Sequence, residues 1–315
     1  MNFTTKVPIT KSNHLINYDS KIVSLGSCFA VNIAEKFNYY KFQHTVNPFG
    51  ILFHPIAIRE IIKRTVHQDF YTEADVFFHN ERWHCFDAHS DLSANNQQDL
   101  LQKLNQNLED LKTNIEAASH ILITYGTAWV YREKAFQKIV ANCHKVPQSQ
   151  FEKELLSIES IQEAIRDAMT LIQSINPKAA IIFTVSPVRH LKDGFTENQR
   201  SKAHLIAAIH QMLEAETTAA YFPSYEIMMD ELRDYRFYAE DMMHPNATAI
   251  EYIWEQFASV SIVSECLAVM EEVESIQKGL AHRPFNPDSA SHLKFTAQLQ
   301  LKIAQLQKRF PKMTF

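Results

Sequence analysis

Residues 21–30 read KIVSLGSCFA and contain the transition that decides the fold. Lys21–Leu25 is an apolar, β-branched run typical of a buried strand. The apolar residues after it repeat at helical spacing: Phe29, Ile33, Phe37 and Tyr40. Residues 26–28 therefore join a strand directly to an amphipathic helix. Because the start of a helix offers unpaired N–H groups and the positive end of its dipole, we expect a thiolate at Cys28 to be stabilised there.

The rest of the chain continues the alternation of strands and helices. Four further runs predict strands: Phe42–Val46, Ile121–Tyr125, Ala180–Val185 and Ala219–Phe222. Helical periods occupy residues 100–115, 158–172 and 206–213, and another helix follows Asn246. This order predicts a parallel sheet covered on both faces, a three-layer αβα sandwich. Gly26, Gly50 and Gly126 follow the first three strands, at the carboxyl ends where such sheets have their sites.

Composition favours a cytoplasmic protein without a nucleic-acid or membrane partner. The formal net charge of −5 gives no reason to expect nucleic acid as a partner. We expect no membrane association, because the first residues lack an apolar leader and no run of eighteen apolar residues occurs. The four cysteines are scattered, as in proteins of a reducing compartment. No cofactor is expected.

Two segments depart from the alternation. We expect residues 1–264 to form the α/β domain, with an insertion or lid at about 66–96, and residues 265–315 to form a helical C-terminal extension. The extension carries an apolar stripe: Phe295, Leu299, Ile303, Leu306 and Phe310. Packing of this stripe on the body of the protein is the favoured interpretation, and a homodimer through the C-terminal helices is the alternative.

A second turn, at Asp241-Met242-Met243-His244, supplies a candidate base. An aspartate three residues before a histidine can hold the imidazole Nδ1 and leave Nε2 to act on a nucleophile. Taken singly, each turn also has a purely structural interpretation. Ser27 would cap a helix beside a buried Cys28, and the second turn would be a capping turn with an exposed histidine. Together they indicate a nucleophile and an oriented base.

The chain resembles the GSCFA-domain family, which is named for the residues found here at 26–30. The resemblance covers about residues 20–260 and includes the turns Asn47–Gly50, Gly126–Trp129 and Asn142–Lys145 as well as Asp241-x-x-His244. That family is similar to the SGNH/GDSL hydrolases. The resemblance implies a flavodoxin-like sandwich with a five-stranded parallel sheet, and hydrolysis of esters or transfer of acyl groups through a nucleophile–His–Asp triad.

The resemblance also assigns roles to residues. Cys28 matches the nucleophile position, Gly50 the oxyanion glycine, and Asp241 and His244 the conserved acid and base pair. The substrate would be an ester-linked or acylated polar molecule, such as a small molecule or a glycan. Whether water or a second substrate accepts the acyl group is left open.

Two departures from the SGNH pattern keep alternatives open. The usual serine is a cysteine, and Ser27 is the alternative nucleophile if the turn is rotated by one residue. The usual oxyanion asparagine is Ala128, so Asn47 or Asn142 would have to supply the missing donor. The rival hypothesis is a non-catalytic ligand-binding protein on an SGNH scaffold.

Other polar residues are expected near the substrate. Arg189 and His190 follow the fourth strand, and His144 belongs to the Asn142–Lys145 turn. With Gly26, Asn47, Gly50, Gly126 and Asn142, they complete the predicted substrate-binding set. A further cluster, His79, His84, Cys85 and His89, has ligand-type residues but no recognisable metal spacing. We therefore favour a lid or an aromatic cluster there over a metal-dependent hydrolase.

Overall fold

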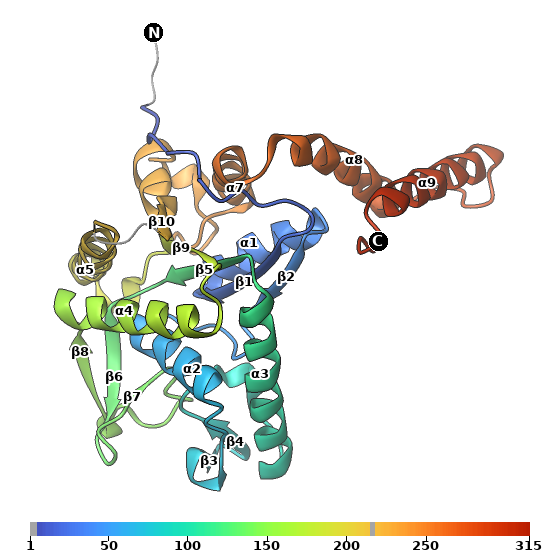
Figure 1. The fold of residues 1–315 in the computed structure, drawn as a ribbon. Coiled ribbons are helices and arrows are strands. Elements are labelled where there is room, and N and C mark those ends of the chain that lie inside the picture. Colours follow the sequence, from blue (N-terminus) through green and yellow to red (C-terminus); the bar gives the residue numbers. More distant parts are fainter. Residues whose placement is uncertain (1–4, 215–217) are drawn as a thin grey trace.

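The structure, a computed structural model, describes residues 5–214 and 218–315. Its centre is a five-stranded parallel sheet in the order β10-β9-β5-β1-β2 (Figure 1). The strands are β1 Lys21–Gly26, β2 Gln43–Val46, β5 His120–Tyr125, β9 Ala180–Val185 and β10 Ala219–Phe222. All five predicted strands are confirmed, and their order is that of a flavodoxin-like sheet.

Helices cover both faces of the sheet, as the strand sequences require. Ile22 and Leu122 pack toward α1 (Cys28–Tyr39) and α7 (Ala247–Ser261). Val23 and Ile121 point to the opposite face, where four helices gather: α2 (Pro55–His67), α3 (Gln97–Ala117), α4 (Ile158–Ile175) and α5 (Phe195–Leu213). Side chains alternate between faces along a strand, so strands that are apolar throughout need a layer on each side. The predicted three-layer sandwich is therefore confirmed.

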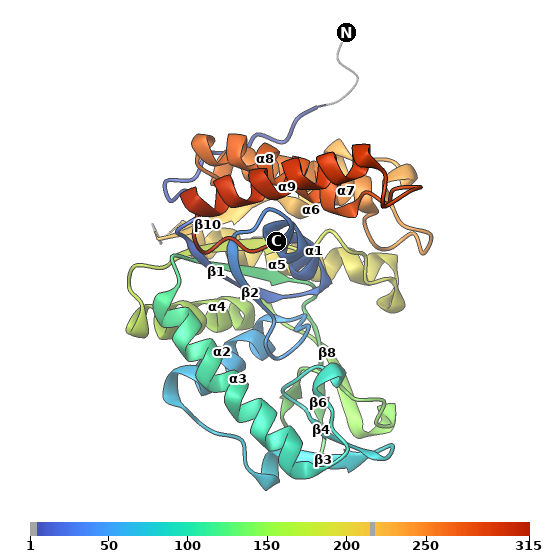
Figure 2. The same ribbon diagram turned by 90° about the vertical axis from the view of Figure 1, so that its right-hand side faces the viewer.

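Two small antiparallel sheets and α2 were not predicted from the sequence. One is a hairpin of β3 (Val76–His79) and β4 (Arg82–Cys85). The other has the order β7-β6-β8 and is built from β6 (Trp129–Glu133), β7 (Ile139–Val140) and β8 (Phe151–Leu155). Both project from the same side of the main sheet (Figures 1 and 2). Their strands have two to five residues and carry many polar side chains, so no long apolar run marks them.

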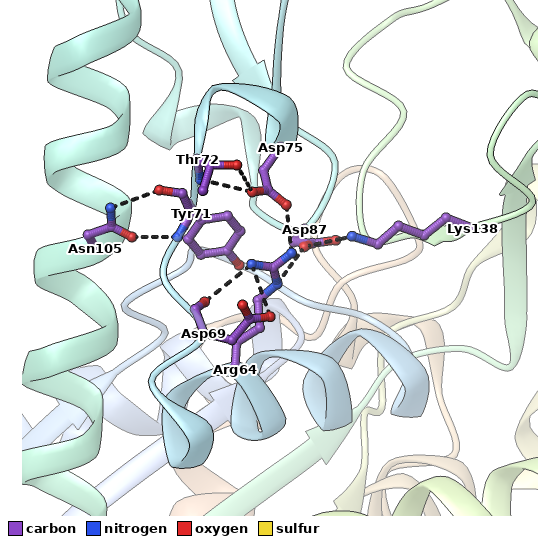
Figure 3. A network of polar contacts seen from close by, with 8 residues as sticks. All are labelled: Arg64, Asp69, Tyr71, Thr72, Asp75, Asp87, Asn105 and Lys138. Carbon is purple, nitrogen blue, oxygen red and sulfur yellow. Dashed lines mark hydrogen bonds and ion pairs between the residues drawn. The ribbon is translucent and has the colours of Figure 1, made fainter.

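A polar network fixes the stretch 66–96 in place (Figure 3). Arg64, at the end of α2, contacts Asp75 at 2.6 Å and Asp87 at 3.4 Å, and its guanidinium lies 4.3 Å from the centre of the Tyr71 ring. Lys138, which precedes β7, reaches Asp87 at 2.7 Å. Because the carboxylate of Asp87 is buried, these two cations are what make its burial tolerable. The network joins α2, the hairpin segment and the β7-β6-β8 sheet.

The C-terminal helices α8 (Ser264–Ala281) and α9 (Ala290–Arg309) lie beside each other at the end of the molecule opposite the small sheets (Figure 2). Leu299, Ile303 and Leu306 of the apolar stripe are buried in the same core cluster as α1 and α7. The stripe therefore packs within its own chain, and the homodimer stays a prediction. Within the described residues, no helix combines the length and apolar character needed to cross a bilayer.

Candidate active site

The turn after β1 is held by backbone contacts that only glycine permits. Gly26 has φ +139°, and a Cβ there would lie 2.1 Å from the Thr124 carbonyl oxygen of β5. The Ser27 N–H donates to that same oxygen at 3.0 Å. The Asn47 side chain brackets the turn, because its Oδ1 accepts from the Gly26 N–H at 2.8 Å and its Nδ2 donates to the Gly26 carbonyl at 3.1 Å. Residues at the carboxyl ends of β1, β2 and β5 thus fix the position at which α1 begins.

A cleft of about 590 Å³ opens at the carboxyl ends of β1, β5 and β9. Its walls come from the start of α1, the loop before α2, the β7-β6-β8 sheet, the loop after β9 and the turn before α7. Six of the predicted site residues line it: Cys28, Asn142, His144, Arg189, His190 and His244. Segments more than 200 residues apart in sequence therefore meet at one edge of the sheet.

The other predicted residues lie outside the cleft lining. Ser27 is fully buried and its hydroxyl has no hydrogen-bond partner, so only Cys28 of the two candidate nucleophiles faces the cleft. Gly26 and Asn47 support the turn from behind. Residues 66–96 are not among the residues that line the cleft, and a lid from this stretch stays a prediction. Cys85 and Ser90 of that stretch contact His144 behind the wall, and strands β6 and β7 of the β7-β6-β8 sheet form the outer wall itself.

The His244 imidazole is oriented by Asp241. Asp241 Oδ2 contacts His244 Nδ1 at 2.6 Å, and its Oδ1 accepts from the N–H groups of His244 at 3.0 Å and Met243 at 2.9 Å. These hydrogen bonds, first the one from the His244 N–H, lower the pKa of Asp241 to about 2 although the carboxylate is exposed. With Nδ1 engaged, Nε2 is the nitrogen left for chemistry.

The Cys28 thiol has an electrostatic environment that differs from the sequence-based expectation. Burial raises the pKa of Cys28 and outweighs the opposing effects of Lys202 and of the N–H groups of Phe29 and Cys28. The N–H groups at the helix start do favour the thiolate, as expected, but burial outweighs them and the pKa is raised. A neutral thiol needs a base to become a nucleophile, which makes a nearby imidazole matter more.

Lys202 of α5 is a buried charge that the sequence-based prediction missed. Its side chain is about 1% exposed, and Nζ donates to the carbonyls of Gly126 and Ser186, each at 2.7 Å. Burial lowers the pKa of Lys202 to about 7, while the neighbouring Cys28 acts in the opposite direction. The sequence did contain an indication that Lys202 is buried. Lys202 precedes Ile206 and Ile209 at helical spacing and so lies on the buried face of α5.

Two of the expected oxyanion donors, the Gly50 N–H and the Asn47 side chain, are already engaged. The Gly50 N–H donates to the Asn47 carbonyl at 2.8 Å, so Gly50 cannot supply the donor that the resemblance implied. Gly50 instead lets the chain pass His89, whose Cβ would lie 2.3 Å from an added Cβ. The Ala128 N–H donates to Ser201 Oγ at 2.7 Å. The N–H groups of Cys28 and Phe29, which face the thiol, are the backbone donors that remain.

Two predicted substrate-binding residues form part of a fixed wall. His144 contacts the Cys85 carbonyl through Nε2 at 2.7 Å and Ser90 Oγ through Nδ1 at 3.2 Å, and burial lowers its pKa to about 4. Asn142 Oδ1 accepts from the His144 N–H at 2.8 Å. Both residues line the cleft, but the imidazole of His144 has no free nitrogen for a substrate.

Arg189 connects the cleft to the loop that carries His244. Its N–H donates to the Met243 carbonyl at 3.1 Å, and its guanidinium lies 4.1 Å from the centre of the Tyr238 ring. This cation–π contact places the guanidinium against Tyr235 and Tyr238, neither of which lines the cleft.

The His79–His89 cluster consists of separate local contacts. His84 Nε2 lies 3.1 Å from the His79 carbonyl, and His89 Nδ1 lies 3.1 Å from Asp91. Over residues 5–214 and 218–315, no three His, Cys, Asp or Glu side chains converge as metal ligands would.

The fold and the cleft define an α/β sandwich with a cysteine and a carboxylate-held histidine at the carboxyl edge of its sheet. The chain belongs to the GSCFA family, whose sequence profile matches residues 21–257. A second profile, that of the C-terminal domain of GSCFA domain proteins, matches residues 273–315. The suspected family is therefore confirmed.

The solved structures that are similar to this chain include two esterases. The Clostridium thermocellum family 3 carbohydrate esterase has 8% identity and a TM-score of 0.36, over 84% of this chain and 99% of that one. An acetyl xylan esterase from the rumen bacterium Butyrivibrio proteoclasticus has 10% identity and a TM-score of 0.37, over 78% of this chain and 64% of that one. A search of curated proteins gave no match.

Proposed function

We propose that this protein is a hydrolase or acyltransferase that forms a thioester on Cys28 from an ester-linked or acylated polar substrate. The observation that carries the proposal is the shared cleft. Cys28 and His244 line it from opposite ends of the α/β domain, and Asp241 holds the His244 imidazole at 2.6 Å. A nucleophile, a base and a group that orients the base are the parts that acyl transfer needs.

In the proposed reaction, His244 Nε2 takes the Cys28 proton as Sγ attacks the substrate carbonyl. The N–H groups of Cys28 and Phe29 donate to the oxyanion that forms. The tetrahedral intermediate then expels the alcohol, which takes the proton from His244, and leaves a thioester. Water or an acceptor hydroxyl then attacks the thioester while His244 takes its proton, the bond between carbon and Cys28 Sγ breaks, and Sγ regains the proton from His244. The raised pKa of Cys28 makes this concerted proton transfer more important than a preformed thiolate.

The cleft walls support a polar substrate with an apolar part. Trp129, Tyr131 and Phe53 provide aromatic surface, and Lys145, Arg189 and Lys192 bring positive charge. Aromatic faces beside hydrogen-bonding groups suit sugars and similar molecules.

The test is covalent labelling by p-nitrophenyl acetate, a generic acyl donor. We expect release of p-nitrophenolate together with an acetyl group on the peptide that contains Cys28. Cys28→Ala should abolish the label, and Ser27→Ala should keep it. Cys143→Ala is the matched control, because Cys143 lines the same cleft and burial raises its pKa to about 11. Labelling of another residue in the wild type would contradict the proposal.

The ligand-binding alternative is favoured by one observation, the engagement of the Ala128 N–H and Gly50 N–H by other groups. Thermal-shift measurements with acetylated sugars, with acetate release followed in parallel, separate the two proposals. Saturable stabilisation without any release or acylation of Cys28 would support the binding protein.

A further inference from the structure

The His190 imidazole has a feature that the proposed mechanism does not use. Its Nε2 atom is buried and has no hydrogen-bond partner in the structure. Buried polar atoms are nearly always paired, so this nitrogen has a hydrogen-bonding capacity that the described residues leave unused. His190 itself lines the cleft with Cys28 and His244.

The position of Nε2 is defined by Gly126. A Cβ added to Gly126 would lie 3.2 Å from His190 Nε2 and 3.2 Å from Ser27 Cβ. Nε2 therefore faces the narrow space between Gly126 and the turn that carries the nucleophile. The ring is held there by an edge-on contact with Phe53, at 5.7 Å between ring centres, and by the hydrogen bond of the His190 N–H to Asn198 Oδ1 at 2.9 Å.

The charge state suits a donor rather than a base. Burial lowers the pKa of His190 to about 3, and the charges of Lys202 and His244 act in the same direction. A neutral imidazole carries one N–H, and it can stabilise a developing negative charge without first being protonated. Lys202 anchors this region through the carbonyls of Gly126 and Ser186.

We propose that His190, as the Nε2–H tautomer, donates a hydrogen bond to the oxyanion that forms when Cys28 attacks the substrate carbonyl. This inference rests on the proposed function and replaces the side-chain donor absent at Ala128. The Sγ–carbon bond forms while the carbonyl electron pair moves onto oxygen and His244 takes the thiol proton. His190 keeps its proton throughout, and the oxyanion electrons return as the alcohol leaves.

The test compares two reactions of Cys28 in the same protein. Acylation by p-nitrophenyl acetate passes through an oxyanion, whereas alkylation by iodoacetamide is a direct displacement and does not. We expect His190→Phe to slow acylation by about 10²–10³-fold, the usual effect of losing one oxyanion donor. Alkylation should change by less than about twofold, since its transition state makes no demand on an oxyanion donor. His190→Gln, which retains an N–H donor, should recover part of the acylation rate.

Each outcome decides the inference. An equal fall in acylation and alkylation would mean that His190 acts on the thiol or on folding, and would overturn the inference. Unchanged acylation in His190→Phe would overturn it as well, while leaving the proposed function intact. Absence of any Cys28 acylation in the wild type would overturn the proposed function and this inference together. Thermal unfolding of both variants accompanies the rates, and Phe keeps the ring packed against Phe53.

Discussion

The turn that carries Cys28 and the loop that carries His244 are held in place by different forces. The turn is buried: Ser27 has no exposed surface, and Gly26 touches the backbone of β5. The loop is open, and the His244 side chain is 44% exposed and fixed chiefly by hydrogen bonds to Asp241. The cleft is therefore formed by a turn that belongs to the hydrophobic core and by a loop whose residues can be substituted without unfolding the protein.

The two regions also tune their titratable groups by different means. Burial raises the pKa of Cys28 and lowers that of Lys202 to about 7. Hydrogen bonds lower the pKa of Asp241 to about 2 in the open loop. We therefore expect substitutions on the buried side to alter folding stability, and substitutions in the loop to alter reactivity.

The largest expected effect is that of His244→Ala on reactivity. Loss of a general base slows the catalysed step by about 10²–10⁴-fold, so acylation of Cys28 by p-nitrophenyl acetate should fall by that factor. The free energy of unfolding should change by less than about 0.5 kcal/mol, because the side chain is exposed. His282→Ala, an exposed histidine just after α8, is the control and should leave both quantities unchanged. A large loss of stability in His244→Ala would contradict the claim that the open loop contributes to reactivity and not to folding stability.

Gly26→Ala should have the opposite pattern. Its Cβ would collide with the Thr124 carbonyl, and φ of +139° is unfavourable for any other residue. We expect a loss of about 3 kcal/mol or more in the free energy of unfolding, measured by urea denaturation. Gly194→Ala is the matched control, since Gly194 has φ +100° but no atom within 4 Å of the added Cβ. Equal losses in the two variants would show that backbone strain alone, and not burial of the turn, sets the cost.

Lys202→Met tests the buried charge through the pH dependence of stability. The folded-state pKa of about 7 lies below the ordinary value of 10.5, so burial of the ammonium destabilises the protein fully below about pH 7. This penalty decreases as the pH rises toward 10.5 and is absent above it. The wild type should therefore gain stability relative to Lys202→Met between pH 7 and 10, by at most about 1.4 kcal/mol per pH unit.

Urea denaturation of both proteins at several pH values measures this difference. The lost hydrogen bonds to Gly126 and Ser186 add an offset that does not depend on pH, so the slope is the quantity to compare. Parallel pH profiles would contradict a buried, titrating Lys202.

Asp241→Asn should have the smallest effect of the four. The amide can still contact the loop, but it holds the His244 Nδ1–H less firmly and does not stabilise an imidazolium. A buried carboxylate that orients a catalytic imidazole contributes about 10⁴-fold. Asp241 is exposed, so we expect a loss in Cys28 acylation that is well below this factor and smaller than that in His244→Ala. Unchanged rates in this variant, measured beside His244→Ala, would show that the exposed contact does not orient the base.

Much of the fold could be predicted because the strands of the main sheet, β1, β2, β5, β9 and β10, follow a simple rule. Buried parallel strands are apolar along their whole length, so runs such as Ala180–Val185 can be recognised as strands in the sequence. In the helices between them, apolar residues repeat at helical spacing. The β7-β6-β8 sheet escaped prediction because its strands are short and its outer faces polar. That sheet forms the outer wall of the cleft, so the sequence indicated which edge held the site but not what covers it.

The features of the site likewise divide into those that local sequence predicts and those that depend on packing. The turns at residues 26–28 and 241–244 could be found because local sequence fixes their shape. The engagement of the Gly50 N–H, the burial that raises the pKa of Cys28 and the position of Lys202 depend on segments distant in sequence. Such effects arise from packing, which no local motif encodes.

The most direct test of the central claim is the rate of Cys28 alkylation by iodoacetamide against pH, in Cys143→Ala with and without His244→Ala. If His244 takes the thiol proton, the protein with His244 reacts faster at neutral pH, and the two rates converge at alkaline pH where hydroxide removes the proton. Coincident profiles over the whole range would show that His244 does not take the proton of Cys28, although both residues line the cleft.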